Sequence, residues 1–161
     1  MRRAALVLVV PVIAVLAAGC GGSSTPSTST PAKNATTTVV ASSATVKTAD
    51  VKGVGVVLVD AAGRTLYTFA PDMAKKVTCV SSACQAAWPS LLAPTKPTGS
   101  GAVDTSLLGT DSGPNGDVVT YDGWPLYTFS GDGTAGTANG QAEDLNGGDW
   151  YVIAPSGKPI E

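Results

Sequence analysis

One pattern of six residues occurs twice in this chain, at an offset of 60 residues. Residues 67–72 read Tyr-Thr-Phe-Ala-Pro-Asp and residues 127–132 read Tyr-Thr-Phe-Ser-Gly-Asp, each preceded by a leucine. Because side chains alternate between the two faces of a β-strand, the tyrosine and the phenylalanine of each copy share one face. The aspartate then falls just beyond the strand, where its carboxylate can accept backbone N–H groups in a turn. The repetition predicts an internal duplication built on two short aromatic strands.

Both copies lie in sequence that is typical of β-hairpins. Residues 54–69 contain two β-prone runs joined by small turn residues, and residues 118–129 contain two more runs around Asp122-Gly123. Asp-Gly is a preferred pair for the two-residue type I′ turn. Residues 150–154 form a further β-prone run, followed by Pro-Ser-Gly. We therefore expect a mainly β fold, a small twisted barrel or sandwich built from two related β-hairpins.

The N-terminus has the layout of an export signal. Arg2 and Arg3 precede an apolar run of 15 residues at 4–18, which is shorter than the about 20 residues that span a bilayer. The string Leu-Ala-Ala-Gly-Cys ending at Cys20 resembles the lipobox of bacterial lipoproteins, in which the cysteine is diacylated. We expect a signal peptide at 1–19, lipid attachment at Cys20, and a location on the extracytoplasmic face of the cell membrane. The alternative is an ordinary secretory signal that leaves a free thiol.

Composition divides the rest of the chain into a tether and one domain. Residues 20–45 are rich in Ser, Thr and Pro and lack aromatic residues, so they are predicted to be disordered, whereas residues 46–161 suit one compact domain. Without residues 1–19 the chain keeps eight basic and twelve acidic side chains, a net charge of −4. No basic cluster is present, which argues against a nucleic-acid partner. The expected partners are the membrane, through the diacylglyceryl cysteine, and an unknown envelope protein, glycan or small ligand.

The three cysteines are an odd number for an exported protein. Acylation of Cys20 would leave Cys79 and Cys84 as a disulfide pair. The composition of residues 82–88 favours a short helix, which Pro89 ends. Five residues of helix rise about 7.5 Å, which exceeds the roughly 7 Å reach of a disulfide. Cys79 is therefore predicted in the loop before the helix, and the fold to contain one short helix after a disulfide.

Several of these features together resemble a known family. The repeated Tyr-x-Phe-x-x-Asp motif, the cysteine pair followed by Trp88-Pro89, and the strand Trp150-Tyr151-Val152 are similar to those of bacterial secreted-repeat lipoproteins, which are predicted lipoproteins with a Tyr-x-(aromatic)-x-x-Asp motif. The resemblance extends over residues 55–160. Because that family is largely uncharacterised, the resemblance implies a cell-envelope location and no particular chemistry.

Histidine is absent from the sequence. Its absence excludes Ser-His-Asp and Cys-His nucleophile systems, imidazole metal ligands and histidine-ligated haem. We therefore predict no catalytic residue, no metal and no cofactor, and a non-enzymatic binding or envelope-interaction module. The candidate binding surface consists of aromatic and acidic residues near the strand ends: Tyr67, Phe69, Asp72, Trp124, Tyr127, Phe129 and Asp132.

Other interpretations of the same residues stay open at this point. Alternating aromatic residues could form a stacking platform for a sugar, quinone or porphyrin, but more often they fill a core, and aspartates more often form turns. Trp124 is the best candidate for exposure, because it follows a tight turn and precedes a proline. One alternative function is an envelope redox or cofactor accessory protein that uses Cys79 and Cys84 with the aromatic faces. Another is a hydrolase that uses paired aspartates.

Overall fold

A computed structural model describes residues 43–161 of the chain. The predicted signal peptide, Cys20 and nearly all of the predicted tether lie outside the described residues. Within residues 43–161, no helix has the length and apolar character needed to cross a membrane. The elements in chain order are β1 Thr45–Val51, β2 Gly55–Val59, β3 Tyr67–Phe69, η1 Ala70–Ala74, α1 Ser82–Ala87, β4 Thr98–Gly99, η2 Thr105–Leu107, β5 Leu108–Gly113, β6 Gly116–Tyr121, β7 Trp124–Pro125, β8 Glu143–Asp144 and β9 Asp149–Val152.

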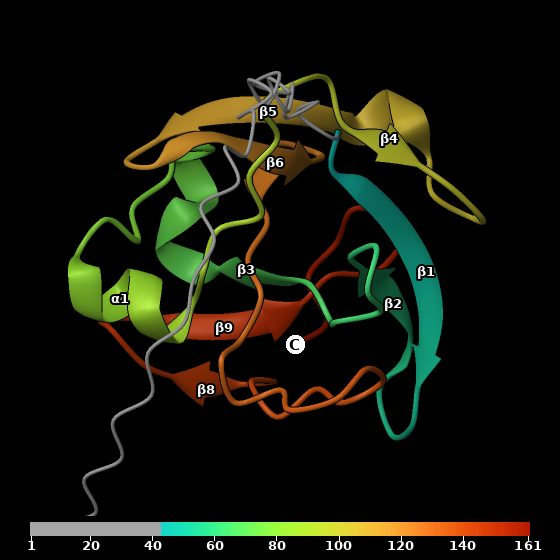
Figure 1. Cartoon of the computed structure of the whole chain (residues 1–161). Helices are drawn as coiled ribbons and strands as arrows, with labels where there is room; N and C mark the ends of the chain where they lie inside the picture. Colours follow the sequence, from blue (N-terminus) through green and yellow to red (C-terminus); the bar gives the residue numbers. More distant parts are fainter. Residues whose placement is uncertain (1–42) are drawn as a thin grey trace, which may run out of the picture. The chain divides into compact units, whose positions relative to one another are not determined.

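The fold is mainly β, as expected, but the strands form three small sheets and do not close into the predicted barrel. The strand orders are β2-β1-β4, β3-β9-β8 and β5-β6-β7 (Figure 1). β1 and β2 form one antiparallel pair, and β5 and β6 form a second. Most of the strands are too short to continue from one sheet into the next. Contacts between the sheets therefore hold the molecule together.

The second predicted hairpin is confirmed. β6 and β7 pair antiparallel with Tyr121 opposite Trp124, and Asp122 and Gly123 have φ values of 49° and 79°. A type I′ turn requires positive φ at both central residues, which Asp and Gly tolerate better than most residues.

The first predicted hairpin forms at its turn and over the residues next to it. The N–H of Asp60 donates to the carbonyl of Arg64 at 2.9 Å, and the Asp60 carboxylate accepts the Arg64 N–H at 2.9 Å. The pairing continues through an antiparallel bridge between Val59 and Thr65 and through the N–H of Leu66, which donates to the carbonyl of Leu58 at 3.0 Å. Farther from the turn the two strands diverge, because β2 pairs with β1 while β3 pairs with β9. The prediction of a hairpin over residues 54–69 is therefore confirmed next to the turn and wrong for the outer part of both strands.

The helix and the disulfide lie where the cysteine spacing places them. Cys79 precedes α1 and Cys84 lies within it, and their Cα atoms are 5.6 Å apart in the bonded pair. The Ser81 hydroxyl accepts the N–H of Cys84 and caps the start of the helix. Both cysteines are buried.

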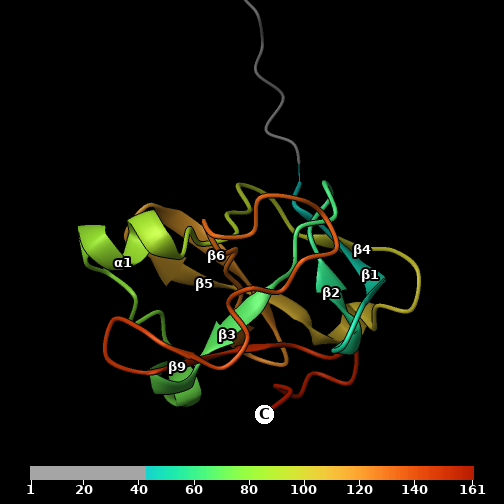
Figure 2. The ribbon, with the colours of Figure 1, turned by 90° about the horizontal axis from the view of Figure 1, so that it is seen from below.

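The duplication predicted from the sequence appears as two repeats that exchange strands. We call residues 45–91 the first repeat and residues 108–154 the second repeat, since each begins with an antiparallel strand pair and ends just after a tryptophan. β3 of the first repeat pairs with β9 of the second, and the two strands lie side by side (Figures 1 and 2). In return, Ser130 of the second repeat donates its N–H to the carbonyl of Ala87 in the first, at 2.8 Å.

The two motif tyrosines form the central backbone hydrogen bonds between the repeats. The N–H of Tyr67 donates to the carbonyl of Tyr127 at 2.9 Å, and the N–H of Tyr127 donates back to the carbonyl of Tyr67 at 3.0 Å. Tyr67 lies opposite Val152, and Tyr127 lies opposite Ser90. Each repeat therefore completes its own sheet contacts with residues of the other repeat.

Gly140 packs so tightly against the aromatic core that a larger residue at this position should destabilise the fold. A Cβ atom at this position would lie 2.5 Å from Cη2 of Trp88 and 3.1 Å from Cδ1 of Phe129. Because rigid aromatic rings cannot move aside easily, Gly140→Ala is expected to lower the free energy of unfolding by about 1–3 kcal/mol.

The matched control is Gly133→Ala. No atom lies within 4 Å of the Cβ position at Gly133, so this substitution is expected to change the stability little. Urea unfolding of both variants measures the difference. Equal free energies of unfolding for the two variants would contradict the tight packing at Gly140.

Candidate functional site

The repeated tyrosine and aspartate form two hydrogen bonds that cross between the repeats. The Tyr67 hydroxyl donates to Oδ2 of Asp132 at 2.7 Å, and the Tyr127 hydroxyl donates to Oδ2 of Asp72 at 2.7 Å. All four residues are buried. The tyrosine of each repeat is thus satisfied by the aspartate of the other repeat, so the motif joins the two repeats inside the core.

Each aspartate also holds the loop that follows it. Oδ1 of Asp72 accepts the N–H of Thr78 at 2.8 Å and its hydroxyl at 2.5 Å, and Oδ1 of Asp132 accepts the N–H of Asn139 at 2.8 Å. These bonds use the carboxylate oxygens that a catalytic or metal-binding aspartate would need. Within residues 43–161, no group of three or more Cys, Asp and Glu side chains is placed to hold a metal ion.

Burial dominates the titration behaviour of these pairs. It raises the pKa of the Asp72 carboxyl, although the hydrogen bonds from Thr78 and Tyr127 act in the opposite direction. Burial also raises the pKa of the Tyr127 phenol, and the neighbouring Asp72 charge raises it further. The pKa of Tyr67 is raised by burial first and then by its bond to Asp132. The tyrosines therefore stay protonated and act as hydrogen-bond donors.

Four other aromatic residues of the two repeats form one stack of rings. Trp88 and Trp150 are stacked with ring centroids 3.9 Å apart and planes inclined by 2°. Phe129 stacks on Trp88, and Phe69 stacks on Trp150, each at 4.2 Å. The stack alternates between residues of the first and the second repeat, since Phe69 and Trp88 come from one and Trp150 and Phe129 from the other. It therefore joins the repeats by packing as the tyrosine–aspartate pairs join them by hydrogen bonds.

These positions correct the candidate binding surface. The residues Tyr67, Phe69, Asp72, Tyr127 and Asp132 are all buried and form the core. Phe129 is half-buried and packs on Trp88. An aromatic platform on the strand faces is therefore absent from the described part, since the faces that would form it are stacked on each other. The redox or cofactor alternative loses the aromatic pocket that it required.

Trp124 is the candidate that remains accessible, and it lines a cavity of about 250 Å³. We call this cavity the aromatic cavity; its lining residues are Thr68, Ala70, Met73, Trp124, Tyr151, Pro159 and Glu161. Trp124 and Tyr151 are half-buried, whereas the Met73 side chain is 74% exposed. Among the aromatic side chains that the structure describes, only Phe129 is also half-buried, and it does not line this cavity.

Two tight turns bring the walls of the aromatic cavity together. The Asp122-Gly123 turn carries Trp124, and the turn ending at Gly157, with φ of 83°, carries the last residues back along β9. The N–H of Ile160 donates to the carbonyl of Val152 at 2.9 Å, which places Pro159 and Glu161 beside Tyr151. The two turns also touch, because a Cβ atom on Gly157 would lie 2.8 Å from Cβ of Asp122.

Part of the wall of the aromatic cavity comes from the first repeat. Thr68 lies opposite Tyr151 in the β3–β9 pair, and its hydroxyl donates to the Tyr151 carbonyl at 3.2 Å. η1 follows β3 directly and carries Met73 outward while its neighbour Asp72 points into the core. Burial raises the pKa of the Tyr151 phenol, and the charges of Asp149 and Glu161 raise it further. The aromatic cavity is thus apolar over most of its wall and electrically negative at one side.

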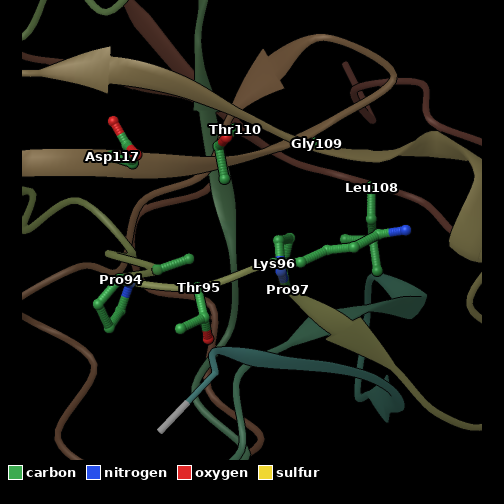
Figure 3. A pocket seen from close by; sticks show the side chains of 9 residues that line it. Pro94, Thr95, Lys96, Pro97, Leu108, Gly109, Thr110 and Asp117 are labelled. Carbon is green, nitrogen blue, oxygen red and sulfur yellow. The ribbon is translucent and has the colours of Figure 1, made fainter. Parts of the chain in front are cut away.

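A second cavity of about 300 Å³ has a different character. Figure 3 shows Pro94 and Thr95 of a loop lying across from Thr110 and Asp117 on strands β5 and β6. Lys96 and Asp117 supply one charge of each sign, and no aromatic side chain lines this cavity. Its wall therefore lacks the large apolar surfaces that give ligand pockets most of their affinity.

The sequence predicted Trp124 but missed Met73 and Tyr151. A signal for Tyr151 was present, since alternation along Trp150-Tyr151-Val152 puts Tyr151 on the face opposite to its buried neighbours. Met73 had no comparable signal, because η1 is a single short turn whose orientation depends on the buried Asp72. Glu161 reaches the cavity only through the folding back of the last residues along β9.

Comparison with known proteins finds one family. A family model that is named for lipoproteins and described as a secreted repeat of unknown function matches residues 46–91 and again residues 109–154. The two matched stretches coincide with the two repeats seen in the structure and cover more than half of the chain. No curated protein matches this chain, and no solved structure matches it.

Proposed function

Because the chain belongs to the secreted repeat family of unknown function, we propose that it is an extracytoplasmic, non-enzymatic binding module that is anchored to the membrane through Cys20 and binds its ligand in the aromatic cavity. The family name and the word secreted support a place in the cell envelope. The lipobox-like sequence at Cys20 supports the lipid anchor, although this residue lies outside the described part.

One observation carries the choice of site. The motif aromatic residues and aspartates are used inside the core, while Trp124, Tyr151 and Met73 come from three different elements and line one cavity. Tryptophan, tyrosine and methionine are the residue types that are enriched at binding surfaces, because each presents a large apolar area. Their convergence supports binding as the function.

The absence of enzymatic activity is part of the same proposal. Among the described side chains that line the aromatic cavity, Glu161 supplies the one carboxylate, and the Tyr151 phenol is the one other group that can act as an acid or base. The paired aspartates that a hydrolase would use are Asp72 and Asp132, and both are buried and hydrogen-bonded to tyrosines. These placements support binding over hydrolysis.

Fluorine NMR on the full-length protein tests the proposed site. The chain has three tryptophans, so 5-fluorotryptophan labelling gives three resonances, and Trp124→Phe identifies the one of interest. We expect members of a mixed library of sugars, amines and short peptides to shift the Trp124 resonance and leave those of buried Trp88 and Trp150 in place.

The control variants locate the binding. Met73→Ala removes an exposed cavity residue and is expected to weaken the shift several-fold, whereas Val80→Ala removes a side chain that is 59% exposed elsewhere and should leave it unchanged. Every ligand is expected to be recovered intact. A library without any effect on Trp124, or a ligand that is converted to product, would contradict the proposal.

A further inference from the structure

We propose that the ligand of the aromatic cavity is a small organic cation, an ammonium group that carries alkyl substituents. This inference rests on the proposed function, since it specifies the ligand of the same site. It depends on three properties of the cavity: its aromatic lining, the sign of its charge and its size.

The lining suits a cation because aromatic rings attract positive charge. The faces of Trp and Tyr carry a negative quadrupole and bind ammonium groups, and clusters of such rings bind alkylated ammonium groups in particular. Trp124 and Tyr151 provide two aromatic rings, and Met73 adds a polarisable thioether. Alkyl substituents on the ammonium would contact Ala70 and Pro159, which are apolar.

The charge on the wall of the aromatic cavity is also negative. Glu161 is the only residue with a full charge at neutral pH among the described residues that line it. Asp149 and Glu161 both raise the pKa of the Tyr151 phenol, so both act at that ring. The Lys75 side chain packs against the backbone next to Trp124, but neither Lys75 nor Lys158 is part of the cavity wall. The charge that a bound ligand contacts directly is therefore the Glu161 carboxylate.

The size of the aromatic cavity suits a small ligand. A volume of about 250 Å³ lies below the range of about 300–1,000 Å³ that is typical of pockets for drug-sized ligands, and it suits a single head group.

Choline and its uncharged isostere test the inference directly. In the fluorine experiment on the full-length protein, choline is compared with 3,3-dimethylbutan-1-ol, which has the same shape without the charge, at constant ionic strength. Choline is expected to shift the Trp124 resonance and to bind about twofold to thirtyfold more tightly than the alcohol, as cation–π energies imply.

Two acidic positions supply the matched variants. Glu161→Gln should weaken choline binding and leave the alcohol unchanged, whereas Glu143→Gln changes an exposed carboxylate outside the cavity and should affect neither ligand. Protein reconstituted in bilayers of phosphatidylglycerol or phosphatidylcholine tells a free cation from a lipid head group. A Trp124 resonance that responds to phosphatidylcholine bilayers but not to free choline would overturn the proposal of a small free ligand.

Equal affinity for choline and the alcohol would overturn the cationic ligand and leave the binding function in place. The same holds if choline and the amines of the library have no effect while an uncharged library member shifts the Trp124 resonance. If no compound shifts Trp124, both the cationic ligand and the proposed function fail. The three results are therefore distinguishable in one set of spectra.

Discussion

Replacing Trp150 with alanine is expected to lower the free energy of unfolding by about 3–5 kcal/mol, the cost of removing a large buried aromatic side chain. Trp150 stacks on Trp88 and on Phe69, and the Tyr127 ring meets it edge-on at 5.1 Å. Its indole N–H also donates to the Leu145 carbonyl at 2.9 Å. Because typical domains are stable by only about 5–15 kcal/mol, this variant should unfold at a much lower urea concentration.

Two comparisons test whether the loss of stability comes from the ring stack or from the removal of any tryptophan. Trp124→Ala should cost far less stability, because Trp124 is half-buried at the aromatic cavity. Trp88→Phe should cost less than Trp150→Phe, since the Trp88 indole N–H has no hydrogen-bond partner among residues 43–161 while that of Trp150 has one. A loss for Trp124→Ala as large as that for Trp150→Ala would contradict the assignment of Trp150 to the core and Trp124 to the site.

Replacing Asp72 with alanine is expected to destabilise the fold by about 3–4 kcal/mol. The substitution removes the acceptor for Thr78 and leaves the buried Tyr127 hydroxyl without a partner. A lost hydrogen bond to a charged group costs about 1.5–3 kcal/mol, and an unsatisfied buried group adds to that loss. Asp144→Ala, at an exposed position in β8, is the control and should change stability by less than about 0.5 kcal/mol.

The raised pKa of Asp72 also predicts how its contribution depends on pH. Because the pKa is higher in the folded state, the folded protein keeps this proton at pH values where the unfolded chain, with a pKa near about 3.9, has lost it. Stability from this group is therefore largest at low pH and declines as the pH rises through the folded pKa. The difference in free energy of unfolding between the natural chain and Asp72→Asn should fall from acid to neutral pH. A difference that grows over this range would contradict the raised pKa.

Local features of the fold were predictable from the sequence. The Asp122-Gly123 turn follows from residues that tolerate positive φ, and the end of α1 follows from Pro89. The position of Cys79 outside the helix follows from the reach of a disulfide. Each of these features depends on residues that are close in the sequence.

The exchange between the repeats was not predictable in this way. Alternation places Tyr67 and Phe69 on one face of a strand, but it does not say that β3 pairs with β9, more than 80 residues later. β1 was missed in part because charged residues at Lys47 and Asp50 interrupt its apolar pattern. The aspartates were expected beyond the strands, as observed, but their tyrosine partners come from the other repeat.

The duplicated motif has its explanation in the fold rather than in binding. Tyr67 and Asp72 are five residues apart, yet the side chain of each forms its tyrosine–aspartate hydrogen bond with a residue of the second repeat. The motif can therefore recur in a family without specifying a ligand. The aromatic cavity, in contrast, is formed mostly by residues outside the motif, together with Thr68 and Ala70 within it.

A double-mutant cycle tests the exchange between repeats most directly. Tyr67→Phe and Asp132→Asn are measured by urea unfolding singly and together, and Tyr67→Phe with Asp72→Asn serves as the matched pair from a single repeat. The crossed hydrogen bond at 2.7 Å predicts a coupling energy of about 1–3 kcal/mol between Tyr67 and Asp132, and additivity within about 0.5 kcal/mol between Tyr67 and Asp72. Coupling between Tyr67 and Asp72, together with additivity between Tyr67 and Asp132, would contradict the intertwined fold.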